Sequence, residues 1–236
     1  MPRILLVHGL GGTAGTMQPL AEGLAAAGHT VHAPTLPGHG TVPEALVGVG
    51  WSDWMRAAQE WRADVIIGQS MGAALALTVA SHHGCRAVVA INPPTPNPDD
   101  VDGLEWRQSR GHGWVDGPPL ADGEVGYTRF PITALLAMAN GVLAIDFDAV
   151  TCPVLLVTSA LDEVVDPAGA DVVAVAVTGA VVRLMLPHSG HVATLGPDLD
   201  RLLPAVVGFI DGFIASDLTK HDHAVEGSGG EAAGHS

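Results

Sequence analysis

A serine with a glycine two positions away on either side constrains this chain more than any other feature. The pentapeptide Gly68-Gln69-Ser70-Met71-Gly72 follows the apolar residues 65–67 and precedes the helix-forming residues 73–77. A serine on a sharp turn between a buried strand and a helix needs neighbours without a Cβ, because side chains there would collide with the strand or the helix. The pattern therefore predicts a nucleophile elbow, with Ser70 at the positive end of a helix.

Short runs rich in Val, Ile and Leu recur along the chain between helical patterns. The runs are residues 4–7, 30–33, 65–67, 87–91, 153–158 and 181–186, and helix candidates lie at about 17–27, 53–62, 71–83, 167–177 and 198–215. Continuous apolar runs are typical of parallel strands that are buried on both faces. We expect an α/β fold with a mostly parallel, doubly wound sheet of about six strands, and ligands at the carboxyl ends of those strands.

The alternation of strands and helices stops between about residues 93 and 148. The segment opens with four prolines and includes a helical stretch at 131–141. We interpret it as a small cap inserted into one α/β domain that spans residues 1–216, since long connections inside a domain are usually functional. Its aromatic residues should mainly form a small core of the cap itself. They are Trp106, Trp114, Tyr127 and Phe130.

The rest of the chain, residues 217–236, is poor in aliphatic side chains and rich in Gly, His, Glu and Ala. Such a composition buries little apolar surface. We expect this tail to be disordered.

Charge and cysteine content exclude several classes of function. The 236 residues include ten Lys and Arg against twenty-five Asp and Glu, a formal net charge of −15. This charge repels nucleic acids and anionic lipid surfaces, and a small neutral substrate fits it better. No apolar run approaches the length of a membrane span, so we expect a soluble, cytoplasmic protein. Cys85 and Cys152 are too few for a disulfide framework and lie far apart in the sequence, which favours two reduced cysteines packed in the core.

A serine hydroxyl needs a base to accept its proton, and the base in turn needs a carboxylate to orient it. In this type of fold the order along the chain is serine, acid, histidine. Asp162 follows the strand at 153–158, and His191 follows the strand at 181–186. Both lie on loops at the carboxyl ends of strands, the edge of the sheet that also carries Ser70. These three residues are our candidate catalytic triad.

Alternatives remain open for two of the three. Glu163 or Asp166 fits the acid by position, although Asp162 comes first after the strand and is followed by hydrophobic residues that anchor the loop. His188 competes with His191. The Ser-Gly pair before His191 and the apolar residues after it favour the second ring.

The loop after the first strand should provide backbone donors for an oxyanion. It reads His8-Gly9-Leu10-Gly11-Gly12, and the Leu10 amide can face the same point as the Met71 amide. We interpret His8 as a structural hydrogen-bonding group beneath this loop. His39, in Gly38-His39-Gly40, is interpreted as part of the loop architecture, with lining of the pocket as the alternative.

With these residues in place the chain resembles the α/β-hydrolase superfamily, and it is similar to small bacterial carboxylesterases and monoacylglycerol lipases. The likeness covers about residues 4–214. It rests on residues 8–10, 36–40, 51–54, 68–72, 160–162 and 189–195. The resemblance implies that Ser70 is the nucleophile, that Asp162 and His191 complete the triad, and that Leu10 and Met71 form the oxyanion hole.

The resemblance also implies a monomer or weak dimer, with no cofactor and no metal, that acts on short to medium acyl esters or monoglycerides. Thioester hydrolysis, acyl transfer and carbon–carbon bond cleavage use the same three groups and remain alternatives. A binding protein that has lost its chemistry is a further alternative.

Overall fold

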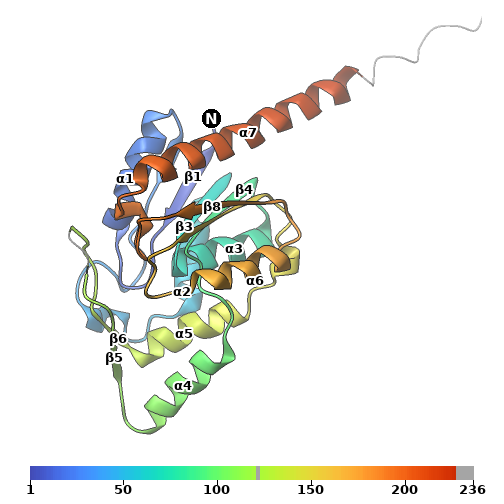
Figure 1. The fold of residues 1–236 in the computed structure, drawn as a ribbon. Helices are drawn as coiled ribbons and strands as arrows, with labels where there is room; N and C mark the ends of the chain where they lie inside the picture. The colour runs from blue at the N-terminus through green and yellow to red at the C-terminus, as the bar shows by residue number, and fades with distance from the viewer. Residues whose placement is uncertain (121–122, 227–236) are drawn as a thin grey trace, which may run out of the picture.

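Six parallel strands form the central sheet of the computed structural model, which describes residues 1–120 and 123–226. The strands lie in the order β2-β1-β3-β4-β7-β8 (Figure 1). Their bounds are Arg3–Val7 (β1), Thr30–His32 (β2), Val65–Gln69 (β3), Ala87–Ile91 (β4), Val154–Ser159 (β7) and Val181–Leu186 (β8). The predicted α/β fold with a six-stranded parallel sheet is confirmed. The strand order reverses at β1, so the ends of β1 and β3 flank the crevice where such sheets bind ligands.

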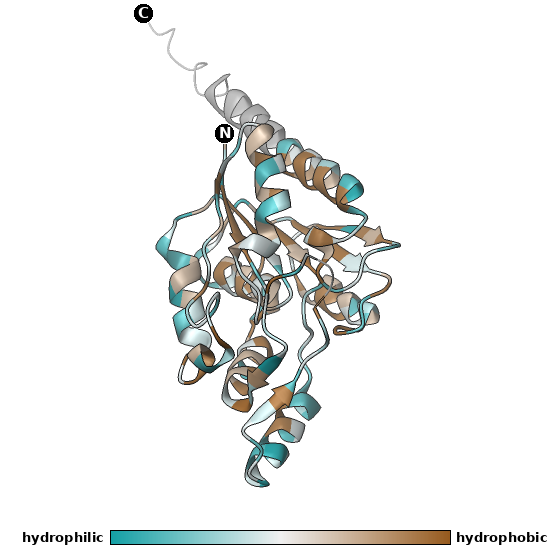
Figure 2. Ribbon diagram, turned by 90° about the vertical axis from the view of Figure 1, so that its left-hand side faces the viewer, coloured by the Kyte–Doolittle hydropathy of each residue, from teal (hydrophilic) through white to brown (hydrophobic). Residues whose placement is uncertain are grey.

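Helices cover both faces of this sheet (Figure 1). One face carries α1 and α7, and the other carries α2, α3 and α6. Their bounds are Ala14–Ala26 (α1), Trp51–Glu60 (α2), Met71–His83 (α3), Ala170–Ala176 (α6) and Leu199–Glu226 (α7). The sheet therefore lies between two hydrophobic cores, and Figure 2 shows its strands as a hydrophobic centre between these helices.

Strand β1 shows why its sequence is a continuous apolar run. Ile4 and Leu6 pack into the core beneath α1 and α7, whereas Leu5 and Val7 pack into the core beneath α2 and α3. All four side chains are fully buried. A strand that is buried on both faces has no position left for an alternating polar residue.

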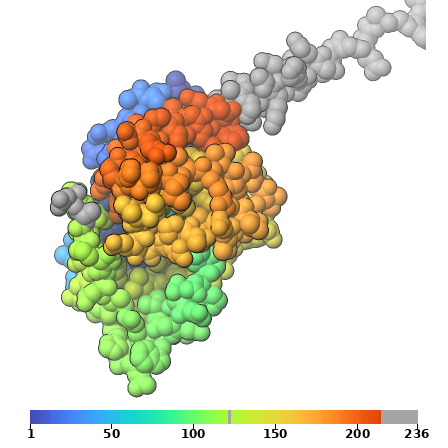
Figure 3. Space-filling model, in the orientation of Figure 1, coloured from blue at the N-terminus to red at the C-terminus, as the bar shows by residue number. Residues whose placement is uncertain are grey.

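The segment between β4 and β7, residues 93–148, is called the cap segment below. It contains α4 (Pro98–Ser109), an antiparallel pair of short strands, β5 (Trp114–Asp116) and β6 (Arg129–Pro131), and α5 (Ile132–Leu143). Helix α5 confirms the helix predicted at 131–141 and packs on α2 and α3, whereas no residue of α4 is buried. Figure 3 shows this green part of the chain projecting from the side of the molecule away from α1 and α7.

The cap aromatics differ from our prediction. Tyr127 is buried and Phe130 partly buried, and both pack against the large core beneath the sheet rather than forming a core within the cap. Phe130 sits so close to Gly11 that a Cβ there would lie 2.6 Å from its ring. Trp106 is instead 59% exposed. The prediction was wrong for Tyr127 and Phe130 because the cap segment folds back onto the loop after β1.

The C-terminal helix is longer than predicted. Helix α7 continues to Glu226, whereas the sequence pattern predicted a helix that ends near residue 215. The sequence from 213 to 226 contains no glycine or proline to end a helix. The remainder of the expected tail, residues 227–236, lies outside the described residues. Within the described chain, no helix combines the length and the apolar character that crossing a bilayer requires.

Candidate active site

Ser70 occupies the sharp turn between β3 and α3 that the sequence predicts. Its backbone has φ 56° and ψ −124°, a left-handed conformation that residues with side chains rarely adopt. A Cβ at Gly68 would lie 2.0 Å from the Gly72 carbonyl oxygen, and a Cβ at Gly72 would lie 2.1 Å from that of Val7. Both positions therefore require glycine, because a Cβ at either one would overlap with backbone atoms of the neighbouring strand or helix.

The structure brings the three predicted triad residues into one chain of hydrogen bonds. The Nε2 atom of His191 lies 2.9 Å from the Ser70 hydroxyl oxygen. The Nδ1 atom of the same ring lies 2.8 Å and 3.0 Å from the two carboxylate oxygens of Asp162. With the proton on Nδ1 donated to Asp162, Nε2 is free to accept the proton of Ser70.

Of the three candidate acids, Asp162 is the one whose carboxylate contacts the His191 ring. Its side chain is 1% exposed, and its Oδ1 atom accepts hydrogen bonds from the amides of Val164 and Val165 at 2.8 and 2.9 Å. Burial alone would raise the pKa of Asp162, but the hydrogen bond and charge of His191 together with the two amides lower that pKa below its ordinary value. Glu163 and Asp166 are exposed, and Asp166 instead caps the Ala168 amide.

Two polar side chains that the sequence did not reveal fix the loop of His191. Asn92 follows β4, adopts φ 46° and donates to the His191 carbonyl oxygen at 2.8 Å. Its side chain also binds Ser159, at the end of β7, through both the backbone amide and the hydroxyl. Gln69 accepts hydrogen bonds from the amide and hydroxyl of Thr194 at 3.2 and 3.0 Å. An Asn directly after a strand is the one signal in the sequence, since Asn tolerates a left-handed backbone.

His188 lies outside this arrangement, as we predicted. Its side chain is exposed, and only its backbone amide is held, by the Asp198 carboxylate at 2.7 Å. The same carboxylate accepts the Ser189 hydroxyl at 2.8 Å. Burial opposes ionisation of Asp198, but these hydrogen bonds lower its pKa below the ordinary value. The Asp198 carboxylate thus stabilises the turn that directly precedes His191.

The loop after β1 passes directly beside Ser70. A Cβ at Gly9 would lie 3.1 Å from the Ser70 Cβ and 3.6 Å from its hydroxyl oxygen. Leu10 is the next residue of this loop. Met71 is the first residue of α3, so its amide has no carbonyl partner within the helix. The amides of Leu10 and Met71 are the two that the sequence predicts as oxyanion donors.

His8 has the structural role that we predicted. Its Nε2 atom accepts the Leu36 amide at 2.9 Å, so Nδ1 carries the proton and donates it to the Gly9 carbonyl oxygen at 2.8 Å. Burial, and secondarily the charge of the neighbouring His39, lower the pKa of His8 to about 4. His8 is therefore neutral at pH 7 and connects the loop beside Ser70 to the segment after β2. His39 is also buried, which lowers its pKa, and donates to Pro37, in keeping with loop architecture.

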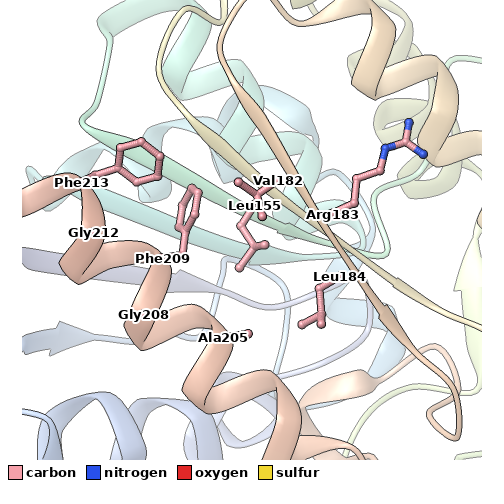
Figure 4. Close-up of a pocket in the computed structure, with 9 residues that line it drawn as sticks. All are labelled: Leu155, Val182, Arg183, Leu184, Ala205, Gly208, Phe209, Gly212 and Phe213. Atoms are coloured by element: carbon pink, nitrogen blue, oxygen red, sulfur yellow. The ribbon is translucent and has the colours of Figure 1, made fainter. Parts of the chain in front are cut away.

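A hollow of about 490 Å³ lies away from these residues, between β7, β8 and α7. Figure 4 shows Phe209 and Phe213 of α7 facing Leu155 and Val182 of the sheet across it. Its lining is apolar apart from Arg183 and includes none of the candidate triad. This hollow therefore contributes nothing to the chemistry at Ser70. Among the side chains that the structure describes, those of residues 1–120 and 123–213, no group of three or more His, Cys, Asp or Glu is arranged to hold a metal ion.

Comparison with known proteins agrees with this fold. Residues 4–201 match the Alpha/beta hydrolase family. The chain belongs to the α/β-hydrolase family. It is 32% identical over 225 residues to the thermostable monoacylglycerol lipase of Bacillus sp. strain H-257, which covers 87% of this chain and 89% of that protein. A 53-residue stretch is 42% identical to a carboxylesterase of Bacillus subtilis strain 168 and covers 22% of each chain.

This α/β-hydrolase is also similar to proteins of known structure. A metagenome-derived lipolytic enzyme superposes with a TM-score of 0.79 at 30% identity, over 89% of this chain and 93% of that chain. The monoacylglycerol lipase of Paleococcus ferrophilus superposes with a TM-score of 0.67 at 18% identity, over 89% and 94%, and shares the fold. The chain is a lipase- or esterase-like α/β-hydrolase, a carboxylic ester hydrolase.

Proposed function

We propose that this enzyme hydrolyses esters of short to medium acyl chains, monoacylglycerols among them, through Ser70, His191 and Asp162. The observation that carries the proposal is the unbroken chain of hydrogen bonds from the Ser70 hydroxyl through the His191 ring to the Asp162 carboxylate, with contacts of 2.9 and 2.8 Å. Three side chains from three loops meet in the geometry that proton transfer from a serine requires.

The reaction proceeds in two steps. His191 Nε2 takes the proton of Ser70 as the hydroxyl oxygen attacks the ester carbonyl carbon, and a tetrahedral intermediate forms. The carbon–oxygen bond to the alcohol breaks, and the imidazolium gives its proton to the departing alcohol. Water then loses a proton to the same nitrogen and attacks the acyl-enzyme. The bond from the acyl carbon to Ser70 breaks, the imidazolium returns the proton to the Ser70 oxygen, and the acid is released.

Each neighbouring group has a defined part in this sequence. Asp162 stays ionised because its lowered pKa favours the carboxylate, and it stabilises the imidazolium as the proton arrives. The amides of Leu10 and Met71 receive the oxyanion, and donors of this kind contribute on the order of 3 kcal/mol each to transition-state stabilisation. Neutral His8 holds the Leu10 loop in place through Gly9.

The substrate class rests on likeness and on charge. The 32% identical relative is a monoacylglycerol lipase, and a neutral ester suits a protein with a formal charge of −15.

We propose that residues 1–216 form the hydrolase domain and that residues 93–148 cap its site. We also propose that the enzyme works in the cytoplasm, without a cofactor, as a monomer or weak dimer. Light scattering during size-exclusion chromatography measures the oligomeric state directly.

Replacement of Ser70 by alanine tests the proposal. Hydrolysis of p-nitrophenyl butyrate and of a monoacylglycerol should fall by several orders of magnitude, and labelling by a fluorophosphonate probe should disappear. Ser81→Ala, on the same helix, is the matched control and should keep both signals. A Ser70→Ala enzyme that works near the wild-type rate would show the assignment to be wrong. An acyl-CoA thioester in the same panel separates ester from thioester hydrolysis.

A further inference from the structure

The two cysteines of the chain, which the sequence separates by 67 positions, touch in the structure. Their sulfur atoms lie 3.5 Å apart. Both residues are only partly buried and carry free thiols. Our interpretation of two unrelated core cysteines missed this contact, because distance along the sequence does not show which strands become neighbours.

The sheet explains the contact. Cys85 lies two residues before the first residue of β4, and Cys152 lies two residues before the first residue of β7. These two strands pair in parallel with Val88 opposite Val154, so the residues just before them meet at the amino edge of the sheet. Ser70, Asp162 and His191 all lie at the carboxyl edge. The thiol pair is thus remote from the candidate active site.

The two thiols are not equivalent. A hydrogen bond joins the two sulfur atoms, and this contact lowers the pKa of Cys152 below its ordinary value. The same bond and burial raise the pKa of Cys85, although its thiol also lies 3.4 Å from the Ala87 carbonyl oxygen. The thiolate is the reactive form of cysteine, and the direction of these two shifts favours Cys152 as the first sulfur to react with an oxidant.

We propose that Cys85 and Cys152 form a reversible intramolecular disulfide when the protein meets a peroxide. The Cys152 thiolate attacks one oxygen of the peroxide, the oxygen–oxygen bond breaks, and a sulfenic acid forms as the other oxygen leaves as water. The Cys85 sulfur then attacks the Cys152 sulfur and expels a second water. Two thiols are oxidised and one hydrogen peroxide is reduced to two waters. The sulfurs approach by about 1.5 Å to reach bonding distance.

The position of this bond gives it a specific structural effect. It closes a loop that contains β4, Asn92 and the whole cap segment, and it joins the two ends of that loop at the base of the sheet. A cross-link that closes a long loop restricts the unfolded chain more than a short one does. Oxidation should therefore stabilise the fold and leave turnover at the far edge of the sheet unchanged.

Peptide mapping without reduction tests the proposal. The full-length protein is treated with hydrogen peroxide, its remaining thiols are alkylated, and it is digested with trypsin. Peptides 63–86 and 130–183 each hold one of the cysteines, and they should appear joined, lighter by two hydrogens than their sum. Dithiothreitol should separate them again. Two alkylated thiols after oxidation, a link formed only between two molecules, or Cys152 sulfinic acid beside a free Cys85 would each overturn the proposal.

Thermal unfolding supplies the second readout. Oxidation should raise the Tm of the wild type by about 5 °C or more, while the rate of ester hydrolysis per folded molecule stays within twofold. Cys85→Ala and Cys152→Ala should each remove the oxidation-dependent rise without loss of basal activity. An equal rise in either variant would show that another oxidised group is responsible. These results are independent of the Ser70 assignment, because none of them depends on the triad.

Discussion

The side-chain amide of Asn92 donates a hydrogen bond of 2.8 Å to the main-chain carbonyl oxygen of His191. The same side chain accepts the Ser159 amide at 2.8 Å. Asn92 therefore connects the ends of β4 and β7 to the loop that presents the imidazole. The positions of His191 and of the strand that precedes Asp162 therefore depend on hydrogen bonds from one residue, Asn92.

Asn92→Asp should lower kcat by about 10- to 100-fold, because a carboxylate has the same shape but cannot donate to the His191 carbonyl, and a displaced imidazole loses alignment with Ser70. KM should change little, since Asn92 lies behind the loop. Steady-state kinetics with p-nitrophenyl butyrate give both values. Ser159→Ala, which removes one of the three hydrogen bonds, is the graded control. Unchanged kcat in Asn92→Asp would contradict a positioning role.

Asp162→Asn should lower kcat by about 10⁴-fold, because the amide no longer fixes the imidazole tautomer that accepts the Ser70 proton. Glu163→Gln and Asp166→Asn are the matched controls, since both side chains are exposed and neither reaches His191. Their activity should stay within about twofold of the wild type. A large loss in either control together with an active Asp162→Asn would move the acid to that neighbour.

Gly72→Ala should fail to accumulate as folded protein, because its Cβ would lie 2.1 Å from the Val7 carbonyl oxygen and the overlap with backbone costs more than a typical domain's stability margin leaves. Gly103→Ala, in α4 with no atom within 4 Å of the new Cβ, should instead stabilise the fold by up to about 1 kcal/mol. Soluble yield and thermal unfolding measure both. Folded Gly72→Ala at normal yield would argue against the rigid turn.

Stability should fall between pH 6.5 and about pH 4 through His8. The ordinary pKa of 6.5 is lowered to about 4 in the folded state, so in this window the unfolded chain binds a proton at residue 8 that the folded chain does not. Stability therefore rises with pH across the window, by about 3 kcal/mol in total for this group. Urea unfolding at several pH values, compared with His8→Gln, isolates the contribution. Parallel pH profiles for the two proteins would exclude His8 as its source.

The elements nearest the candidate site follow closely from the sequence, since local pattern fixes them. The flanking glycines identify the turn at Ser70, and the strand order places Asp162 and His191 on loops at the same edge. Both glycines prove to be sterically required, which is why the pattern is informative in a single sequence.

The residues that the sequence did not reveal act across long separations. The pentapeptide motif allows any residue at position 69, yet the Gln69 side chain accepts a hydrogen bond from the amide of Thr194, 125 residues away. The Cys85–Cys152 contact and the packing of Tyr127 on the loop after β1 depend in the same way on which segments become neighbours. Helix α7 extends further than expected because composition alone does not show where a helix ends.

The cap segment leaves the sheet after β4 and returns to it at β7, the strand beside it. An insertion that exits and re-enters between neighbouring strands can be replaced as a unit without changing any strand order. Tyr127 attaches it near Ser70, since its amide donates to the Gly11 carbonyl oxygen and its hydroxyl donates to that of Gly38. Because we propose that this segment caps the site, we expect chimeras that keep this tyrosine and exchange the rest of residues 97–147 to differ in acyl-chain preference.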